Sequence, residues 1–310
     1  MNILITSVGT ATSIGLIKNF KQSGNVIIGV DINPFGYTAG SQMVDYYQQV
    51  PYADDAEYIT VIKEIVSTRK VDILIPVNDI EIYVLSKHKE EIGCSCIIPD
   101  ISVIDLCRDK YICSRKIEEL GVNVSEILDK DDITIKRILR DRIGVGSKGI
   151  KILEAGEISP DYVADKKFLQ RFVEGEEYTV DILADKNGNP VYIVPRKRLE
   201  VKSGVATKVK VEKQDELITT VKKILKNFTL PGFSNMQFIK DKNNVFWFIE
   251  INYRFSGCGA ATIAVSPEFI NSFLKLFNGT EYIGEINADV KWNSVVTRYY
   301  EEIVYEESIS

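Results

Sequence analysis

Residues 234–252 read SNMQFIKDKNNVFWFIEIN, two apolar runs separated by the polar residues 241–244. Apolar runs on either side of a short Asp/Asn-rich segment are typical of a β-hairpin. If residues 241–244 form the loop, Lys240 lies opposite Val245, and Asn235 lies opposite Glu250. Side chains alternate between the two faces of a strand, so one face is expected to carry Asn235, Gln237, Ile239, Phe246, Phe248, Glu250 and Asn252. The other face then carries Met236, Phe238, Trp247, Ile249 and Ile251.

The polar end of this hairpin combines one carboxylate with three amides among apolar neighbours. Buried polar groups need hydrogen-bond partners or a ligand. One interpretation is a local hydrogen-bond network that joins the strands. The other is a site for Mg²⁺, which takes oxygen ligands and usually binds through one or two carboxylates together with substrate phosphates. Arg254, two residues beyond Asn252, would then meet a phosphate.

A glycine-rich segment, GVGSKG at residues 144–149, lies between strand-like segments at 138–142 and 150–153. The backbone N–H groups of such a loop bind phosphates in some enzymes, and Lys148, Arg140 and Arg142 add positive charge. A surface turn is an equally weighted interpretation. A second glycine segment, at residues 9–15 with Asp31 ending the next strand, lacks the GxGxxG spacing of a dinucleotide site and favours a tight turn. The sequence contains no Walker A motif.

The first hundred residues alternate short apolar runs with amphipathic segments. We expect strands at 2–8, 25–31, 71–77 and 96–99, and helices at 13–22, 56–69 and 79–91. This alternation is typical of parallel βαβ units. Ser7 and residues 76–79 would follow strands at the edge where open α/β sheets bind ligands, and we expect part of an acceptor site there. For Asp79 we favour the role of a helix N-cap, and Ser13 is the expected cap of the first helix.

The pattern changes after residue 108. A charged amphipathic helix at 109–120 is followed by strand-like segments separated by glycine turns, at 133–139, 149–153, 168–172, 178–185, 191–199 and 294–302. Further helices are expected at 215–227 and 267–277. The predicted fold class is α/β, with an N-terminal parallel α/β domain followed by a two-lobed α+β region.

Composition and charge argue against several classes of function. The 310 residues include 38 Lys and Arg against 44 Asp and Glu, which argues against nucleic-acid binding as the main role. His88 is the single histidine, so a Ser-His-Asp triad and a two-histidine zinc site are poor interpretations. Five cysteines without CxxC spacing favour reduced thiols. With neither a signal-peptide pattern nor an apolar run of about 18 residues, we expect a cytoplasmic protein that makes no membrane contact.

Together these segments resemble the ATP-grasp superfamily, especially single-module relatives of the carbamoyl-phosphate synthetase large chain. Residues 232–257, GFSNMQFIKDKNNVFWFIEINYRFSG, are similar to the family's metal-binding "SN-x-QF … E-x-N-P-R" segment, with Tyr253 in place of the proline. The resemblance implies a pre-ATP-grasp Rossmann-like domain at 1–107. It also implies an ATP-grasp lobe with a glycine flap at 108–173 and a second lobe with the metal site at 174–310.

The resemblance also implies a set of site residues. The metal ligands would be Gln237, Glu250 and Asn252, holding Mg²⁺, with Mn²⁺ as the alternative ion. Arg254 would bind the transferring phosphate or acyl phosphate, supported by Asn235. The residues implied to bind ATP are Lys110, Arg140, Gly146, Ser147, Lys148, Gln170, Arg171, Phe172, Val173 and Glu177. Residues 140–141, Arg-Asp, stand where the family often has Lys-Pro.

By this resemblance the chain is expected to be an ATP- and Mg²⁺-dependent ligase. It would form a C–N bond between a small-molecule carboxylate and an amine through an acyl phosphate. The alternatives are an ATP-dependent small-molecule kinase on the same scaffold and a nucleotide-binding module without turnover, which the Arg140–Asp141 pair favours. A nicotinamide oxidoreductase is the weakest alternative. The sequence identifies neither substrate and leaves a homodimer open.

Overall fold

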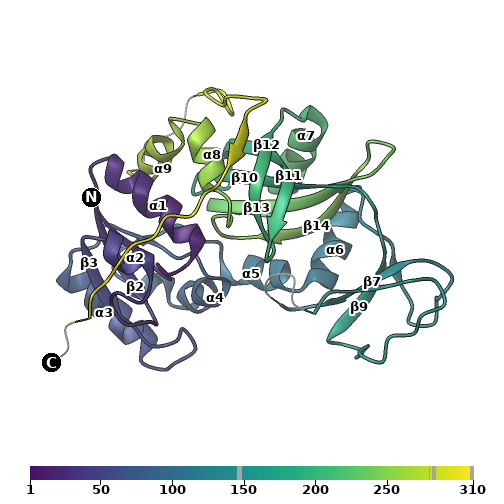
Figure 1. Cartoon of the computed structure of the whole chain (residues 1–310), viewed down its shortest axis with the longest axis horizontal. Helices are drawn as coiled ribbons and strands as arrows, with labels where there is room; N and C mark the ends of the chain where they lie inside the picture. The colour runs from purple at the N-terminus through teal and green to yellow at the C-terminus, as the bar shows by residue number, and fades with distance from the viewer. Residues whose placement is uncertain (145–148, 279, 281–283, 308–310) are drawn as a thin grey trace.

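The computed structural model describes residues 1–144, 149–278, 280 and 284–307, and these residues form three β-sheets flanked by helices (Figure 1). A parallel sheet lies in the N-terminal part of the chain, and two antiparallel sheets follow it. The predicted α/β fold class, with a parallel domain before a two-lobed antiparallel region, is confirmed. Within this described part of the chain, no helix is long and apolar enough to cross a membrane.

The N-terminal sheet has the strand order β3-β2-β1-β4-β5, and all its neighbouring strands are parallel. The strands are β1 (Asn2–Ile5), β2 (Val26–Asp31), β3 (Tyr46–Gln49), β4 (Ile73–Ile75) and β5 (Ser95–Cys96). Helices cover both faces, so the strands are apolar on both sides. Leu4 belongs to the core on one face and Ile3 and Ile5 to the core on the other.

Two groups of helices make up these faces. α3 (Tyr58–Thr68) and α4 (Asp79–Lys87) supply buried side chains to the Leu4 side, while α1 (Ala11–Gln22) supplies them to the Ile3 side. The prediction of Ser13 as the cap of the first helix is wrong. Thr10 is the N-cap, and its hydroxyl accepts a hydrogen bond from the Ser13 N–H. The sequence analysis also missed the short helix α2 (Ala39–Met43) and strand β3.

A small antiparallel sheet forms the first lobe of the following region. Its order is β6-β9-β7-β8, with β6 (Ile127–Leu128), β7 (Arg137–Asp141), β8 (Lys151–Leu153) and β9 (Lys167–Arg171). Four leucines, one from each strand, form its core: Leu128, Leu139, Leu153 and Leu169. Two helices precede it, α5 (Ile101–Arg108) and α6 (Lys110–Glu119). Asp109 caps α6 by accepting the backbone N–H groups of Tyr111 and Ile112.

The large antiparallel sheet forms the second lobe, with the strand order β14-β13-β10-β11-β12-β15. The strands are β10 (Glu176–Ala184), β11 (Pro190–Lys202), β12 (Val205–Val211), β13 (Gly232–Lys240), β14 (Phe246–Asn252) and β15 (Val295–Thr297). Its helices are α7 (Asp215–Leu225), α8 (Ala260–Val265) and α9 (Phe269–Phe277). Phe273 of α9 packs against Phe20 of α1, with ring centroids 5.7 Å apart, so this lobe shares a core with the N-terminal sheet.

The hairpin of β13 and β14 forms as predicted, but its predicted register is wrong. Lys240 pairs with Phe246 rather than Val245, and a bulge at Ile249 shifts the pairing by one more residue. Asn235 therefore lies opposite Asn252, and Gln237 lies opposite Glu250. The two shifts add up to two residues, which preserves side-chain parity, so the four polar side chains still share one face.

The aromatic residues of β14 were assigned to the wrong face. Phe248 pairs with Phe238 and packs against its ring, with the centroids 5.7 Å apart. Phe246 is buried against Tyr178 on the same side, with centroids 5.4 Å apart. The bulge at Ile249 lies between these aromatics and Glu250. It turns the aromatic side chains into the core and the polar ones away from it.

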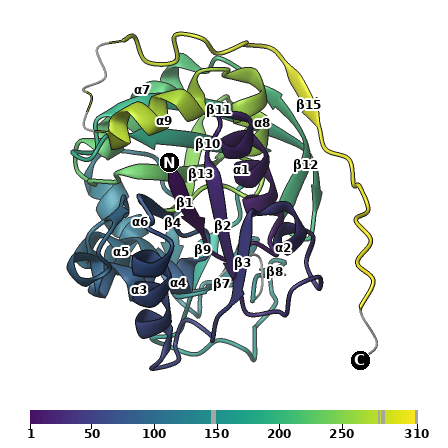
Figure 2. The same ribbon diagram turned by 90° about the vertical axis from the view of Figure 1, so that its left-hand side faces the viewer.

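The C-terminal segment after β15 runs in an extended path over the N-terminal domain. Figure 2 shows it leaving β15 and passing α2 on the outside of the molecule. The Arg298 guanidinium donates to the carbonyl oxygens of Gly257 (2.7 Å) and Ala11 (3.3 Å). Tyr305 packs edge-on against Phe35, with ring centroids 5.4 Å apart. The segment thereby connects the large sheet to the N-terminal domain.

Candidate active site

A cavity of about 240 Å³ lies between the small and large antiparallel sheets. Most of the described residues that the resemblance assigns to ATP binding line this one cavity: Arg140, Gln170, Arg171, Phe172, Val173 and Glu177. The small sheet and the segment after it contribute the first five, and β10 contributes Glu177. Three further predicted residues, Gly146, Ser147 and Lys148, lie outside the described residues.

Arg140 is a buried cation that connects the two lobes. Its Nη1 donates to Gln170 Oε1 (3.2 Å) and to the Ile249 carbonyl (3.3 Å), and its Nη2 lies 3.5 Å from Glu250 Oε2. Burial lowers the pKa of Arg140, and the charge of Glu250 opposes that effect. The guanidinium therefore lies where this cavity meets the polar end of the hairpin.

Glu177, one of the residues implied to bind ATP, is paired with an arginine of the large sheet. Arg198 of β11 lies 2.7 Å from the Glu177 carboxylate, and both residues line the cavity. The Arg171 side chain has a different partner, Glu126, at 2.6 Å. A basic run such as residues 196–198 is an ambiguous signal in sequence, because solvated strands carry the same residues.

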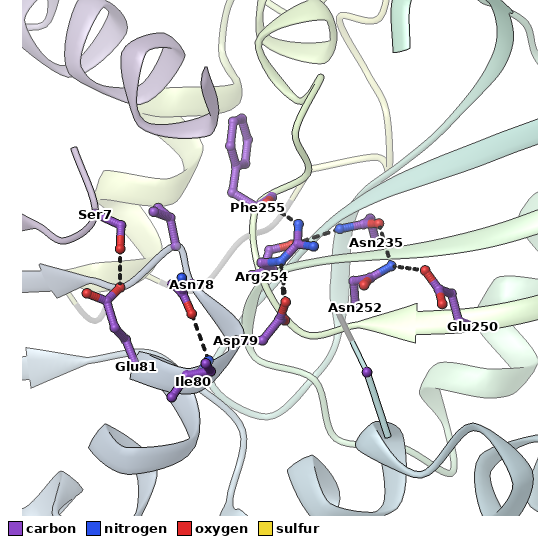
Figure 3. Close-up of polar contacts among 12 residues, drawn as sticks. Ser7, Asn78, Asp79, Ile80, Glu81, Asn235, Glu250, Asn252, Arg254 and Phe255 are labelled. Carbon is purple, nitrogen blue, oxygen red and sulfur yellow. Dashed lines mark hydrogen bonds and ion pairs between the residues drawn. The ribbon is translucent and has the colours of Figure 1, made fainter. Parts of the chain in front are cut away.

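The polar end of the hairpin forms a connected network (Figure 3). The Asn252 amide nitrogen donates to Asn235 Oδ1 and to Glu250 Oε1, both at 3.2 Å. The Asn235 amide nitrogen donates to the Arg254 carbonyl at 3.0 Å. The structure thus brings Asn235, Glu250 and Asn252 into contact, and Gln237 pairs with Glu250 in the neighbouring strand.

These side chains are suited to a hard divalent cation. Glu250, Gln237 and Asn252 offer carboxylate and amide oxygens, the donor type that Mg²⁺ takes. They include one formal negative charge, and Arg140 already neutralises part of it. Among the residues that the structure describes, no group of three or more His, Cys, Asp or Glu side chains is placed to hold a metal. The set therefore fits an ion that brings further oxygen ligands with it, as a nucleotide-bound Mg²⁺ does.

Lys110 lies on the other side of the hairpin end. It lines a cavity of about 200 Å³ together with Glu250, Asn252 and Asp79. Its Nζ donates to the carbonyl of Gly144, the first residue of the glycine-rich segment, at 2.7 Å. Burial lowers its pKa, while the nearby charge of Glu250 acts in the opposite direction.

Arg254 forms an ion pair with the N-terminal domain. Its Nε lies 3.0 and 3.2 Å from the two Asp79 carboxylate oxygens (Figure 3). The preference for Asp79 as the N-cap of α4 is therefore wrong. Asn78 has that role, and its side chain accepts the Ile80 N–H at 2.9 Å. The cap of α4 is therefore one residue earlier than predicted. Because Asp79 does not cap the helix, its carboxylate can pair with Arg254.

A cavity of about 320 Å³, called the second cavity below, continues from the 240 Å³ cavity between the two sheets toward the N-terminal domain. The two cavities share Arg140, Arg198 and Gln237. Only the second reaches Arg254, and on the N-terminal side it is lined by Thr10, Thr12, Val77, Asn78 and Asp79. Residues 77–79, predicted to form part of an acceptor site, thus line this cavity. Ser7, predicted for the same site, instead donates its hydroxyl to the buried Glu81 at 2.9 Å.

Asp31, the residue on which a nicotinamide site would depend, has structural partners. Its carboxylate accepts the backbone N–H groups of Gly9 (2.7 Å) and Asn33 (3.1 Å). A Cβ added at Gly9 would lie 2.9 Å from the same carboxylate, so the glycine allows this close approach. The arrangement favours the tight turn expected from the sequence.

Two family models match the chain. Residues 164–298 match the family described as "ATP-grasp in the biosynthetic pathway with Ter operon", and residues 3–97 match "PylC-like, N-terminal domain". No curated protein matches the chain. The predicted resemblance to the ATP-grasp superfamily is confirmed.

Solved structures share the fold over nearly the whole chain. A biotin carboxylase from Campylobacter jejuni aligns with a TM-score of 0.71 and 19% identity, covering 95% of this chain and 74% of that one. N5-carboxyaminoimidazole synthetase from Staphylococcus aureus aligns with a TM-score of 0.71 and 15% identity, covering 96% and 79%. An L-amino acid ligase from Bacillus licheniformis aligns with a TM-score of 0.70 and 13% identity, covering 92% and 77%. At these identities the likeness shows a common fold.

Proposed function

Because the chain carries an ATP-grasp domain behind a PylC-like N-terminal domain, we propose that it is an ATP- and Mg²⁺-dependent ligase. In this proposal it joins a small-molecule carboxylate to an amine through an acyl phosphate. The biotin carboxylase, the synthetase and the amino acid ligase that share its fold support this class of reaction. The substrates themselves are left open.

The observation that carries the proposal is the continuity of the two cavities. One lies between the two lobes and is lined by the residues proposed to bind ATP, and the other faces the N-terminal domain. They meet at Arg140 and Gln237, beside Glu250. A nucleotide in the first cavity and an acceptor in the second would therefore face each other across the hairpin end. Such positioning is the main requirement of phosphoryl transfer.

The proposed reaction has two steps. The acceptor carboxylate attacks the γ-phosphorus of ATP, the bond to the β-phosphate oxygen breaks, and ADP leaves with the electron pair. An amine then attacks the acyl carbon, phosphate leaves, and a proton is released. Mg²⁺ held by Gln237, Glu250 and Asn252 would supply charge neutralisation at the phosphates.

The side chains of this protein would position and stabilise charge in this reaction. In the first cavity, the buried Arg140 faces the phosphates with its charge only partly balanced by Glu250. Lys110 reaches the same region from the Gly144 side. Arg254 would exchange its Asp79 partner for the transferring phosphate, because both are oxyanions that fit a guanidinium. None of these roles needs a histidine base.

The kinase alternative uses the same two cavities and stops after phosphoryl transfer. The second cavity has room for an acceptor beside the metal ligands, an observation that both outcomes share. The non-catalytic alternative predicts nucleotide binding without turnover under any condition. The Arg140–Glu250 pair is its main support, because a metal must compete with a cation for that carboxylate.

The test is an assay with ATP, Mg²⁺ and mixed panels of carboxylates and amines, in which ADP and free phosphate are measured separately. A ligase releases both, and their release depends on a carboxylate and an amine together. ADP without free phosphate identifies the kinase. Absence of ADP with every panel, while ATP binds, contradicts the ligase and favours the non-catalytic module.

A further inference from the structure

One arginine beside the second cavity has an incomplete set of partners. Arg196 of β11 is 1% exposed and lines this cavity. Its Nε and Nη2 donate to the two oxygens of Asp181 at 2.7 and 2.8 Å, and Nη2 also donates to the Ser256 hydroxyl at 3.0 Å. Its Nη1 is buried and has no partner among the described residues. A buried donor without an acceptor is costly, so this nitrogen is a candidate ligand contact.

The partners of Arg196 fix its position firmly. Asp181 is itself buried and also accepts a hydrogen bond from the Thr262 hydroxyl. The two-pronged contact with Asp181 holds the plane of the guanidinium. Since Asp181 already balances the charge of Arg196, the pair tolerates burial, and Nη1 keeps a donor that no described residue uses.

The sheet register places Arg196 in line with the metal ligands. Glu250 pairs with Gln237, Gln237 with Thr179, and Thr179 with Arg196, across strands β14, β13, β10 and β11. Residues paired in this way lie on one face of a sheet. Neighbouring strands are 4.7–4.9 Å apart, so the backbone of Arg196 lies about 10 Å from that of Gln237.

This separation distinguishes two anion positions in one cavity. An oxyanion at Gln237 and Glu250 belongs to the nucleotide and the reacting group. An oxyanion at Arg196 is two strands away, beyond Thr179, which also lines the cavity. A small molecule in a space of about 320 Å³ can place one end at each position.

Building on the proposed ligase function, we propose that Arg196 binds a carboxylate that does not react. The substrate class is therefore a small molecule with a carboxylate remote from its reacting group. This carboxylate comes either from a dicarboxylic acid that is activated at its other end or from an amino acid that serves as the amine. Arg196 is in this view a specificity-determining residue, separate from the groups that hold ATP.

The test uses a double variant, Arg196→Gln with Asp181→Asn, which replaces the buried ion pair with two neutral amides that can still hydrogen-bond to each other. Single removal of Arg196 would leave Asp181 buried without its partner and endanger folding. Lys208→Gln is the matched control, because it removes a cation of the same sheet that pairs with the exposed Glu200. Thermal unfolding of each protein is measured with dicarboxylic acids and with L-amino acids at fixed ionic strength, and MgADP affinity is measured by calorimetry.

We expect at least one compound of either panel to stabilise the wild type and the Lys208→Gln control. The double variant should bind that compound about tenfold more weakly or worse, as the loss of a hydrogen bond to a charged group produces. Its MgADP affinity should stay within about twofold of wild type. The panel that responds identifies which substrate carries the carboxylate.

Three results would overturn the proposal. These are unchanged ligand binding by the folded double variant, no stabilisation of the wild type by either panel, and a parallel loss of MgADP affinity, which would assign Arg196 to the nucleotide. The ligase function is judged by a different readout, the release of ADP and phosphate. If a carboxylate binds in a way that depends on Arg196 but no ADP or phosphate is released, the ligase function is contradicted. The proposal that Arg196 binds a carboxylate is then still supported.

Discussion

At the scale of single residues, Glu250 contacts two side chains, an amide and a guanidinium. Its carboxylate accepts a hydrogen bond from the Asn252 amide nitrogen at 3.2 Å and lies 3.5 Å from the Arg140 guanidinium. In the proposed reaction it also holds the metal, so the carboxylate charge is shared between a fixed cation and an arriving one. The same residue therefore bears on both the stability of the buried arginine and the binding of MgATP.

Glu250→Gln should separate these two contributions. Gln keeps an acceptor for Asn252 and Arg140 but removes the charge, so ADP formation should fall about a hundredfold or more, as with other losses of electrostatic stabilisation. Steady-state ADP release and the Mg²⁺ concentration dependence are the measurements. Glu216→Gln, on the exposed first turn of α7, is the control. If Glu250→Gln releases ADP at a rate within about twofold of wild type, Glu250 does not bind the metal.

Glu81 provides a pH-dependent prediction. Burial raises its pKa to about 7 from a usual value of 4.5, although the hydroxyl groups of Thr6, Ser7 and Tyr58 donate to it and oppose the shift. The folded protein thus binds this proton more tightly than the unfolded chain does. Its contribution to stability is fully present below about pH 4.5 and is lost as the pH rises through about 7.

Glu81→Gln should therefore flatten the pH dependence of the free energy of unfolding between about pH 5 and 7. Urea unfolding at a series of pH values measures this. Glu90→Gln, on an exposed 3₁₀ turn, is the control and should keep the wild-type slope. Parallel profiles for wild type and Glu81→Gln would show that Glu81 does not titrate in this range.

At the scale of elements, the β13–β14 hairpin shows what the sequence could and could not predict. Its two strands, its loop region and the common face of Asn235, Gln237, Glu250 and Asn252 followed from alternation. The register did not, because it depends on a five-residue turn and a bulge at Ile249. Strict alternation puts Phe246 and Phe248 with Glu250, whereas the aromatics belong in the core and the carboxylate at the cleft.

Other elements show the same limit. The apolar parallel strands and amphipathic helices of the N-terminal domain were predictable from their sequence patterns. β3 and α2 were not, because Tyr46–Gln49 and Ala39–Met43 contain no apolar run that would mark them. Asp79 was misassigned because its neighbour Asn78 is an equally good cap, and its contact with Arg254 joins residues 175 positions apart. The domain boundaries after residues 107 and 173 stay predictions.

The aromatic core beneath the hairpin is open to a direct test. Phe248 is 1% exposed and packs against Phe238. Phe248→Ala should lower the free energy of unfolding by about 3–5 kcal/mol, because it removes buried contacts and leaves a cavity. Denaturant unfolding measures the loss, with Lys242→Ala in the exposed loop as the control. A loss below about 1 kcal/mol would mean that the core collapses around the smaller side chain.

At the scale of the whole molecule, several contacts hold the N-terminal domain to the large sheet. Gly15 of α1 approaches α8 so closely that an added Cβ would lie 2.7 Å from the Ala260 Cβ. The Asp79–Arg254 ion pair and the Phe20–Phe273 contact join the same two parts. The C-terminal segment adds Arg298, which donates to carbonyl groups of both.

Arg298→Ala should loosen this connection. We expect faster amide hydrogen exchange in α1 and in residues 299–307, because the guanidinium no longer joins Gly257 to Ala11. The matched control is Lys18→Ala, which removes the exposed ion pair to Glu301 and should have little effect. Equal exchange in wild type and Arg298→Ala would show that the segment is held by its other contacts.

The second cavity takes one wall from each part of the chain. Thr10, Thr12, Asn78 and Asp79 lie in the region that matches the PylC-like N-terminal model, while Arg196 and Arg254 lie in the region that matches the ATP-grasp model. A chimera in which residues 3–97 are replaced by a homologous domain would retain the half of the cleft that we propose binds ATP. Such a graft could redirect which compound the enzyme accepts.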